Sequence, residues 1–336
     1  VESGVGERLK RECLVHHGIE LRFGGRGHRI DLSGLTGGRT VTIYAQHEVI
    51  KDLVKARLDA GGQILFGVSD VSVHDFTGTT PRVRFSKDGV AQELNCDFIA
   101  GCDGFHGVCR DSIPTGVLTL HDQHYPFAWL GVLADAPPVS PELIYTHHLR
   151  GFALFTMRTT RVSRLYLQCA PDEDVANWAD DRIWQELRTR LGDHGGLELR
   201  DGPILQKGIT AMRGFVIEPM QHGRLFLAGD AAHIVPPTGA KGLNLAVADV
   251  RILSRALSRF YSSGRTDLLD RYSEACLRRV WQVQRFSWWM TSLLHRFPGE
   301  GDLRNRLQLA ELDYLASSRA AMTALAENYV GLPFDD

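Results

Sequence analysis

Long apolar runs, paired cysteines and strong net charge are all missing from this sequence. No stretch of about 18 apolar residues occurs, so no segment predicts a transmembrane helix. The formal net charge is −2, which gives no electrostatic reason to expect a nucleic acid or an anionic membrane as a partner. The six cysteines are scattered, without a C-x-x-C pair or a histidine cluster at ligand spacing. This pattern favours reduced thiols in a cytoplasmic protein over a disulfide framework or a metal site.

Two further absences concern the start of the chain. The first residue is Val1 and the first methionine is Met157, so we expect a fragment of a longer protein. A strand followed by G-x-G-x-x-G and a helix, the unit that holds a dinucleotide pyrophosphate, is also missing. Gly4-Val5-Gly6 lacks the third glycine, and residues 24–27 are expected to form a turn. Without this unit, the pyrophosphate of a dinucleotide cofactor would lack its usual binding loop.

What is present indicates a mixed α/β protein. The 336 residues suffice for two domains, and 43% apolar with 23% charged residues is ordinary for a globular chain. Apolar or alternating segments predict strands at residues 40–44, 63–68, 83–85 and 94–100, and antiparallel strands at 127–134, 142–147, 152–158 and 163–168. Apolar residues at helical spacing predict helices at residues 48–60, 173–191, 267–298 and 302–326, and a long helix from about 242 to 260.

This order of elements suggests a nucleotide-binding sheet that carries an inserted antiparallel sheet and ends in a helical region. We expect residues 1–116 and 213–266 to form the nucleotide-binding domain, residues 117–212 the inserted sheet, and residues 267–336 the helical region.

The most informative string is GDAAHIVPPTGAKGLN, residues 229–244. A strand ends at Asp230, whose carboxylate could accept hydrogen bonds from sugar-like hydroxyls. Gly239 to Asn244 then begin a helix, and the free N–H groups and positive dipole of a helix start suit an anionic group. A plain strand–loop–helix corner would need its glycines only for packing. The whole string favours a ligand site.

A second string, GCDGFHG at residues 101–107, is equally typical of an ordinary turn when taken alone. Together with the first string it places two carboxylates, Asp103 and Asp230, after two strands. Open α/β sheets bind ligands in the crevice at the carboxyl ends of their strands.

Both strings resemble the DG and GD motifs of the class A flavoprotein monooxygenases, the FAD-dependent aromatic hydroxylases. MQHGRLFLAGD, QRFSWWMTSLLHRFP and AENYVGLP extend the likeness from about Gly18 to Pro333, toward members that hydroxylate 4-hydroxybenzoate. The resemblance implies an FAD-binding Rossmann-like fold, conversion of 4-hydroxybenzoate to 3,4-dihydroxybenzoate with NAD(P)H and O₂, and a homodimer. The cofactor-binding residues that it implies are Gln46, Asp103, Arg164, Asp230, Pro237, Gly239, Lys241, Gly242, Leu243 and Asn244.

The antiparallel strands offer a substrate face. Because side chains alternate along a strand, Thr156 and Arg158 share one face of their strand, and Arg164 and Tyr166 share one face of the next. A solvated face is the ordinary interpretation of such residues. The guanidinium of an arginine nevertheless suits a carboxylate through its planar fork. The resemblance implies that Arg158 binds the substrate carboxylate with help from Thr156, where the family usually has serine, and from Tyr166.

Hydroxylation beside a phenol requires the phenolate, which makes the ring electron-rich. The resemblance implies that Tyr145 accepts the phenol proton and relays it through Tyr329 toward His16, because histidine titrates near neutral pH. It also implies that Pro237 offers its carbonyl to the phenol. Each residue alone would be an ordinary core side chain, and their joint match favours the catalytic interpretation.

Three hypotheses remain open from the sequence. The chain is an FAD-dependent 4-hydroxybenzoate hydroxylase, or an inactive fragment that lacks the glycine loop for FAD, or a hydroxylase of another phenolic acid such as 3-hydroxybenzoate. His106, Arg110 and Arg213 are candidates for binding the phosphates of NAD(P)H, although each could equally be a surface charge. The choice between NADPH and NADH is not predicted.

Overall fold

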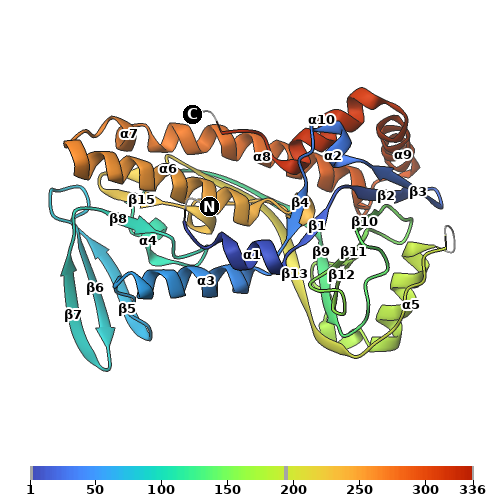
Figure 1. Ribbon diagram of the computed structural model, residues 1–336, viewed down its shortest axis with the longest axis horizontal. Helices are drawn as coiled ribbons and strands as arrows, with labels where there is room; N and C mark the ends of the chain where they lie inside the picture. Colours follow the sequence, from blue (N-terminus) through green and yellow to red (C-terminus); the bar gives the residue numbers. More distant parts are fainter. Residues whose placement is uncertain (1–2, 193–195, 335–336) are drawn as a thin grey trace. The chain divides into compact units, whose positions relative to one another are not determined.

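The computed structural model describes residues 3–192 and 196–334. The chain forms two compact units, each assembled from segments that are separated in the sequence (Figure 1). The first unit comprises residues 1–60, 125–212 and 289–336, and the second unit comprises residues 61–124 and 213–288. The predicted functional domains are a different kind of division, and they stay a prediction.

The first unit contains the larger part of a mixed sheet with the strand order β16-β13-β9-β12-β11-β10-β2-β3, of which β16 and the segments 119–124 of β9 and 213–218 of β13 belong to the second unit. The strands are β2 (Ile19–Phe23), β3 (Arg26–Ile30), β9 (Thr119–Ala134), β10 (Leu143–Thr146), β11 (Ala153–Met157), β12 (Ser163–Cys169) and β13 (Ile204–Glu218). The ladders β9–β12, β12–β11, β11–β10 and β2–β3 are antiparallel, and β10–β2 is parallel. The antiparallel strands predicted from residue 127 onward are therefore confirmed.

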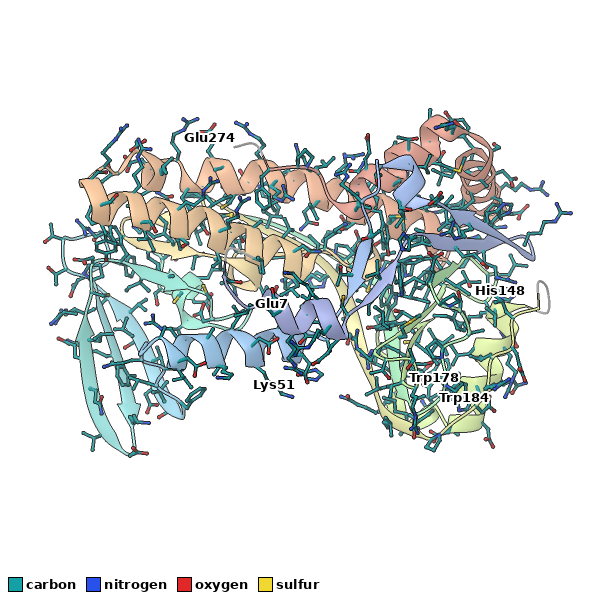
Figure 2. All side chains as sticks on the ribbon, in the orientation of Figure 1. Glu7, Lys51, His148, Trp178, Trp184 and Glu274 are labelled. Carbon is teal, nitrogen blue, oxygen red and sulfur yellow. The ribbon has the colours of Figure 1, made fainter. Side chains whose placement is uncertain are left out.

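One face of this sheet is an apolar core. Phe155, Leu165 and Leu167 pack there with Trp178 and the helix α5 (Asp180–Leu191). Figure 2 shows Trp178 and Trp184 on the α5 side of the sheet. Because strand side chains alternate, the neighbouring residues of β11 and β12 point to the opposite face. That opposite face carries the polar residues of the predicted substrate site.

Shorter elements complete the first unit. They are α1 (Gly6–Glu12), the antiparallel pair β1 (Leu14–His16) and β4 (Val41–Ile43), α2 (Leu32–Leu35), α3 (Gln46–Asp59), the 3₁₀ helix η1 (Val175–Asn177), α9 (Asp302–Ser317) and α10 (Arg319–Val330). Helix α10 packs against α2 and α9. The sequence predicted one helix over 302–326. The helix is interrupted at Ser318, because this residue has extended backbone and its hydroxyl accepts a hydrogen bond from the N–H of Ala321 as the N-cap of α10.

The second unit contains two small sheets and several helices. In one sheet β8 (Ile99–Gly101) runs parallel to β15 (Leu225–Leu227), which pairs antiparallel with β14 (Gln221–His222). The other elements are the antiparallel sheet β5 (Val68–His74), β6 (Arg82–Lys87) and β7 (Val90–Asn95), the short strand β16 (His233–Ile234), the 3₁₀ helices η2 (Gly229–Ala231) and η3 (Pro237–Gly239), and the helices α4 (Val108–Asp111), α6 (Gly242–Ser263), α7 (Asp267–Asp270) and α8 (Tyr272–Leu294).

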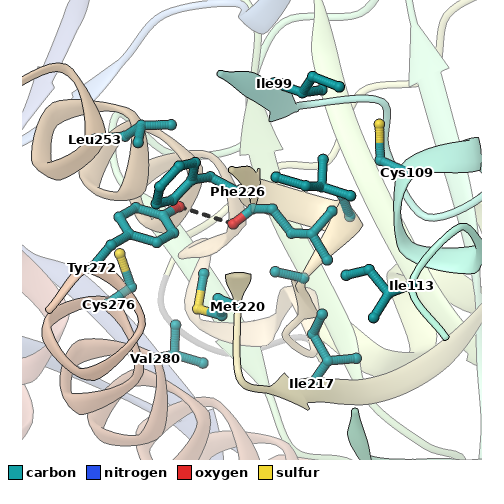
Figure 3. Close-up of a cluster of buried hydrophobic side chains, with 14 of the residues drawn as sticks. Ile99, Cys109, Ile113, Ile217, Met220, Phe226, Leu253, Tyr272, Cys276 and Val280 are labelled. Atoms are coloured by element: carbon teal, nitrogen blue, oxygen red, sulfur yellow. Dashed lines mark hydrogen bonds between the residues drawn. The ribbon is translucent and has the colours of Figure 1, made fainter. Parts of the chain in front are cut away.

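The core of the second unit surrounds β15 (Figure 3). Phe226 and Tyr272 are almost fully buried, and the Tyr272 hydroxyl donates a 2.8 Å hydrogen bond to the carbonyl of Leu227. Burying an aromatic side chain such as Phe226 stabilises a fold by about 1.5–3 kcal/mol. This packing fixes the end of β15. The chain then enters the segment between β15 and α6 that starts with Gly229 and Asp230, which is called the Gly-Asp loop below.

The predicted fold class is confirmed, with one wrong strand. Residues 63–68 were expected to form a strand, but β5 begins only at Val68. Leu65 and Phe66 are exposed, and Gly67 has a φ of 68°, so the segment does not continue as an extended chain. The strand expected at 94–100 is also split, into the end of β7 and the start of β8.

Two structural features are missing from the described chain. In residues 3–192 and 196–334, no helix combines the length and apolarity that crossing a membrane would require. The same residues contain no cluster of three or more histidine, cysteine, aspartate or glutamate side chains arranged to hold a metal ion.

Candidate active site

Tyr145 and Tyr329 form a buried pair in the first unit. Their hydroxyl oxygens lie 2.6 Å apart, and either one can be the donor. Only 1% of Tyr145 and 4% of Tyr329 is exposed. Burial raises the pKa of Tyr145 well above its ordinary value and that of Tyr329 to about 12. Both hydroxyls are therefore protonated at neutral pH, and the pair can move a proton only by passing one on as another arrives.

His16, the predicted end of the relay, lies in β1 and is completely buried. Within the described residues, neither of its ring nitrogens has a hydrogen-bond partner. Burial lowers the pKa of His16, and the carboxylate of Glu142 partly opposes this effect. A buried polar group without a protein partner commonly bonds to an ordered water. The role of His16 as a proton acceptor stays a prediction.

The structure brings together the polar residues predicted on β11 and β12. Thr156 pairs with Arg164 across the two strands, so their side chains share a face. The Nε of Arg164 donates a 3.1 Å hydrogen bond to the Tyr166 hydroxyl, and its guanidinium lies 5.0 Å from the Tyr166 ring centre. Arg158 follows directly after β11, with its side chain exposed. An exposed guanidinium beside a hydroxyl-bearing face is suited to bind a carboxylate.

Two residues of this face were missed by the sequence-based prediction. Trp129 on β9 and His295, which follows α8, are buried and joined by a 2.7 Å hydrogen bond. The Trp129 ring lies 4.9 Å from the Tyr166 ring. Alternation along β9 could have placed Trp129 on the face of Tyr166, but no local pattern links it to a histidine 166 positions away.

The carboxylate of Asp249, on α6, anchors the Gly-Asp loop of the second unit. One oxygen of this carboxylate accepts a 2.9 Å hydrogen bond from the backbone N–H of Gly229 and lies 2.6 Å from Nε2 of His233. Gly229 has a φ of 64°, and a Cβ there would lie 3.0 Å from the Cβ of Ala246, so a glycine is required. These contacts leave Asp230 exposed at the turn. The sequence-based prediction missed Asp249 because it resembles any polar residue of an amphipathic helix.

The N-terminus of α6 follows this loop. The first backbone bond of the helix runs from the N–H of Leu245 to the carbonyl of Lys241. Gly242, Leu243 and Asn244 therefore have N–H groups without an intrahelical acceptor, as at any helix start. Leu243 and Asn244 are exposed. Such an end suits a negatively polarised group.

Lys241 and Pro237, two of the predicted ligand-binding residues, already interact with other groups of the second unit. Burial lowers the pKa of Lys241 to about 8, with a smaller contribution from Arg279. Its Nζ lies 5.7 Å from the centre of the Phe286 ring. The carbonyl of Pro237 already accepts a 2.9 Å hydrogen bond from the N–H of Ala240, so one lone pair remains for a ligand. Gly239 is buried against Phe286 and has no room for a side chain without movement of that ring.

The Cys-Asp-Gly turn is also well ordered by its own contacts. Oδ2 of Asp103 accepts a 2.9 Å hydrogen bond from the N–H of Cys109 in α4. A Cβ at Gly107 would collide with the Asp103 side chain, so this glycine allows the close approach. Asp103 remains exposed, and so does Gln46, the first residue of α3 in the first unit.

The arginines predicted to bind NAD(P)H have partners within the second unit. Arg213 forms a bidentate ion pair with Asp122, with distances of 2.8 and 2.5 Å. Arg110 donates a 2.6 Å hydrogen bond to the carbonyl of Phe105. The guanidiniums of Arg110 and Arg213 lie 4.5 and 4.3 Å from the Phe105 ring centre. His106 is exposed. Whether these residues bind NAD(P)H stays a prediction.

The residues of the second unit fit a flavin nucleotide. Asp103 and Asp230 are exposed carboxylates that follow β8 and β15, two adjacent parallel strands, and they can accept hydrogen bonds from hydroxyls. The strand expected to end at Asp230 ends earlier, at Leu227, and Asp230 lies in η2. The start of α6 supplies donors for a negatively charged edge or phosphate. The donor set therefore matches a ligand that combines hydroxyls with anionic groups.

The chain is similar to known flavoproteins in sequence. Residues 1–287 match the sequence model of the family described as FAD binding domain. The chain is 52% identical over 334 residues to the p-hydroxybenzoate hydroxylase of Acinetobacter baylyi, covering 99% of this chain and 82% of that protein. It is 26% identical over 217 residues to a probable NADH-specific resorcinol 4-hydroxylase of Rhodococcus jostii, covering 62% of this chain and 39% of that protein.

Solved structures share the fold. The p-nitrophenol 4-monooxygenase of Pseudomonas putida matches with a TM-score of 0.82 at 17% identity, over 98% of this chain and 87% of that one. A ternary complex of aklavinone-11 hydroxylase with FAD and aklavinone matches with a TM-score of 0.71 at 21% identity, over 87% and 59% of the two chains. At these identities the likeness concerns the fold alone, and it confirms the predicted fold class.

Proposed function

Because the chain belongs to the class A FAD-dependent aromatic hydroxylases, we propose that it hydroxylates 4-hydroxybenzoate to 3,4-dihydroxybenzoate with NAD(P)H and O₂. FAD is the cofactor of this family, and when bound it supplies the activated oxygen that is transferred to the ring. The observation that carries the choice of substrate is the buried hydrogen bond between Tyr145 and Tyr329. A phenol in the para position to a carboxylate needs both a proton relay and an anion-binding group, and the first unit offers both.

The tyrosine pair activates the phenol in this proposal. Tyr145 binds the phenol oxygen, and because its own pKa is raised it stays protonated and donates a hydrogen bond to the phenolate. The phenol proton passes to Tyr145 as the Tyr145 proton passes to Tyr329. His16 is the proposed acceptor beyond Tyr329. Acid–base groups of this kind contribute about 10²–10⁴-fold to a rate.

The polar face of β11 and β12 orients the acid. Arg158 pairs with the carboxylate, and the hydroxyls of Thr156 and Tyr166 add hydrogen bonds. The Arg164 side chain holds the Tyr166 hydroxyl through the 3.1 Å hydrogen bond from its Nε. This arrangement fixes the ring so that the same carbon is presented in each turnover.

The residues that bind the flavin nucleotide are part of the same proposal. Asp230, Asp103 and the start of α6 bind the flavin nucleotide, and Lys241 lies directly before that helix start. The full set proposed for the cofactor is Gln46, Asp103, Arg164, Asp230, Pro237, Gly239, Lys241, Gly242, Leu243 and Asn244. The match of residues 1–287 to the FAD-binding family does not favour the alternative of an inactive fragment. The 52% identity to a p-hydroxybenzoate hydroxylase does not favour another phenolic acid.

The direct test is turnover. The chain is supplied with FAD, 4-hydroxybenzoate and either NADH or NADPH, and both coenzyme oxidation and 3,4-dihydroxybenzoate are measured. We expect oxidation that depends on 4-hydroxybenzoate and little with 3-hydroxybenzoate. No stimulation with either coenzyme, in a protein that retains FAD through gel filtration, would contradict the proposed substrate. Loss of FAD on gel filtration would contradict the cofactor assignment.

Two further proposals accompany this function. We propose that the protein is a cytoplasmic homodimer, as the family resemblance implies. Light scattering coupled to gel filtration measures the oligomeric state, and a mass of about 75 kDa is expected for the dimer from twice the chain mass of 37.4 kDa. We also propose residues 1–116 and 213–266 as the FAD-binding domain, residues 117–212 as the substrate-binding domain and residues 267–336 as the helical region.

A further inference from the structure

We infer that His295 is a positioning residue for the substrate face, because it fixes the indole of Trp129, which in turn supports the ring of Tyr166. The link from Tyr166 to the substrate rests on the proposed function. The link from His295 to Tyr166 rests on geometry within the first unit alone.

The hydrogen bonds of His295 define one tautomer. Nε2 lies 2.7 Å from Nε1 of Trp129, and Nδ1 lies 2.9 Å from the carbonyl oxygen of Thr291. An indole N–H can only donate, so Nε2 of His295 must be the acceptor. The ring proton is therefore on Nδ1, which donates to the carbonyl of Thr291. A protonated imidazole would have no acceptor left for Trp129.

The ring of His295 is held in place by stacking. It is fully buried and lies between Phe127, at a centroid distance of 4.6 Å, and Phe152, at 4.3 Å. Burial lowers the pKa of His295 to about 3, so the ring stays neutral under working conditions. The backbone is also fixed, because the carbonyl of His295 accepts a 2.8 Å hydrogen bond from Gln308. The imidazole cannot shift without disturbing several aromatic contacts.

Trp129 contacts both His295 and Tyr166, so it links the fixed His295 ring to the substrate face. Its ring stacks on Phe152 at 5.1 Å and lies 4.9 Å from Tyr166. The residue directly opposite Tyr166 on β9 is Gly131, which has no side chain to support the tyrosine ring. Trp129 is two residues away on the same face, so it supplies the missing contact. Arg164 holds the other end of Tyr166 through its hydroxyl.

If His295 had a purely structural role, the expected results would differ. In that case any change would lower stability and leave the Tyr166 ring and ligand affinity unaffected. Three variants separate the two roles. His295→Phe keeps the aromatic stack and removes the acceptor, whereas His295→Gln keeps an acceptor for the Trp129 N–H. The matched control is Trp178→Phe in the same unit. Trp178 is 3% exposed, lies in the apolar core on the opposite face, and its Nε1 has no hydrogen-bond partner in the described chain.

The experiment measures two quantities on the full chain loaded with FAD. The first is the Kd for 4-hydroxybenzoate. We expect His295→Phe to raise it about tenfold, since small misplacements of a binding group are costly, and His295→Gln to restore it to within about threefold. Trp178→Phe should leave it unchanged while lowering the melting temperature. An unchanged Kd in His295→Phe, beside a loss of stability like that of Trp178→Phe, overturns the inference.

The second quantity needs no substrate. NMR of the chain with labelled tyrosine rings reports the surroundings of Tyr166, assigned by its absence in Tyr166→Phe. His295→Phe should shift this resonance or speed its ring flips, and the two other variants should not. If His295→Phe does not fold, Trp129→Phe removes the donor of the same hydrogen bond and should give the same result. An unaltered Tyr166 resonance overturns the inference even where the unvaried chain binds 4-hydroxybenzoate. Failure of that chain to bind the acid contradicts the proposed function instead.

Discussion

The hydroxyl oxygens of Tyr145 and Tyr329 lie 2.6 Å apart although the residues are 184 positions apart in the sequence. One belongs to β10, the strand between β11 and β2, and the other to the last helix of the described chain, α10. Both side chains are buried, so the hydrogen bond is shielded from water and stronger than an exposed one. This pair is the basis of the first prediction.

Tyr329→Phe is expected to slow hydroxylation about 10²-fold, because it breaks the relay at its second member while the ring and its packing remain. The Kd for 4-hydroxybenzoate should change little, and the fraction of bound ligand present as phenolate at pH 8 should fall, as measured by absorbance. Tyr314→Phe serves as the control, because Tyr314 lies on α9 of the same unit and is exposed. Equal rates in both variants would remove Tyr329 from the mechanism.

Arg158→Ala is expected to weaken binding of 4-hydroxybenzoate by roughly 10- to 150-fold, the equivalent of about 1.5–3 kcal/mol for hydrogen bonds to a charged group. Binding of phenol, which has no carboxylate, should weaken much less. Arg161→Ala is the control, since Arg161 is an exposed arginine three residues further along. Similar losses for the acid and for phenol would show that Arg158 does not bind the carboxylate.

Much of the fold follows from local patterns in the sequence. Alternation with a period of two identified β11 and β12 and correctly placed Thr156, Arg164 and Tyr166 on one face, because backbone geometry alone determines this property. The segment 63–68 was wrong because apolar composition does not reveal the positive φ of Gly67. Periodicity in the sequence predicts which residues share a face of one helix or strand, and it does not predict how separate elements pack together.

The partners of the site residues could not be predicted in the same way. Asp249 lies on α6, and its role depends on two hydrogen-bonding groups in the preceding loop. His295 depends on Trp129, a residue from a distant strand. Such contacts arise only when separate segments pack together, and no local propensity encodes them. The family resemblance identified groups that would touch ligands, and the structure adds those that hold them in place.

Asp249→Asn is expected to weaken FAD binding about 10-fold or more. The change compromises the single oxygen that serves both Gly229 and His233, and a buried group left unsatisfied costs about 1–3 kcal/mol. FAD affinity is measured by quenching of flavin fluorescence. Tyr261→Phe is the control, because it removes a hydrogen bond to Asp97 near the C-terminal end of the same helix, α6, and leaves the contacts of Asp249 in place. Equal FAD affinities in both variants would mean that Asp249 only stabilises the fold.

The free energy of unfolding should depend on pH through His295. Its pKa is about 3 in the folded chain and about 6.5 when unfolded, so the unfolded state binds the proton first as pH falls. The stabilisation is complete above pH 6.5 and declines toward pH 3. Between pH 7.5 and pH 5 the unvaried chain should therefore lose about 2 kcal/mol more than His295→Gln does, at about 1.4 kcal/mol per pH unit.

Denaturant titrations of the two proteins at both pH values check this expectation. Other buried histidines, such as His16 and His147, titrate in both proteins, so their effects cancel in the difference. Identical pH dependence in the two proteins would mean that His295 is not held neutral by burial.

Gly131 has a consequence for how this site can vary. A methyl group at this position would lie 2.9 Å from an Nη of Arg164 and 3.4 Å from the Tyr166 ring, and its three nearest atoms would all belong to these two side chains. The glycine therefore leaves the space that the Arg164 guanidinium occupies beside Tyr166, and an added methyl group would force that side chain to move. Exchange of Gly131 for alanine would therefore shift Arg164 relative to Tyr166 through a position that is not itself proposed to contact a ligand.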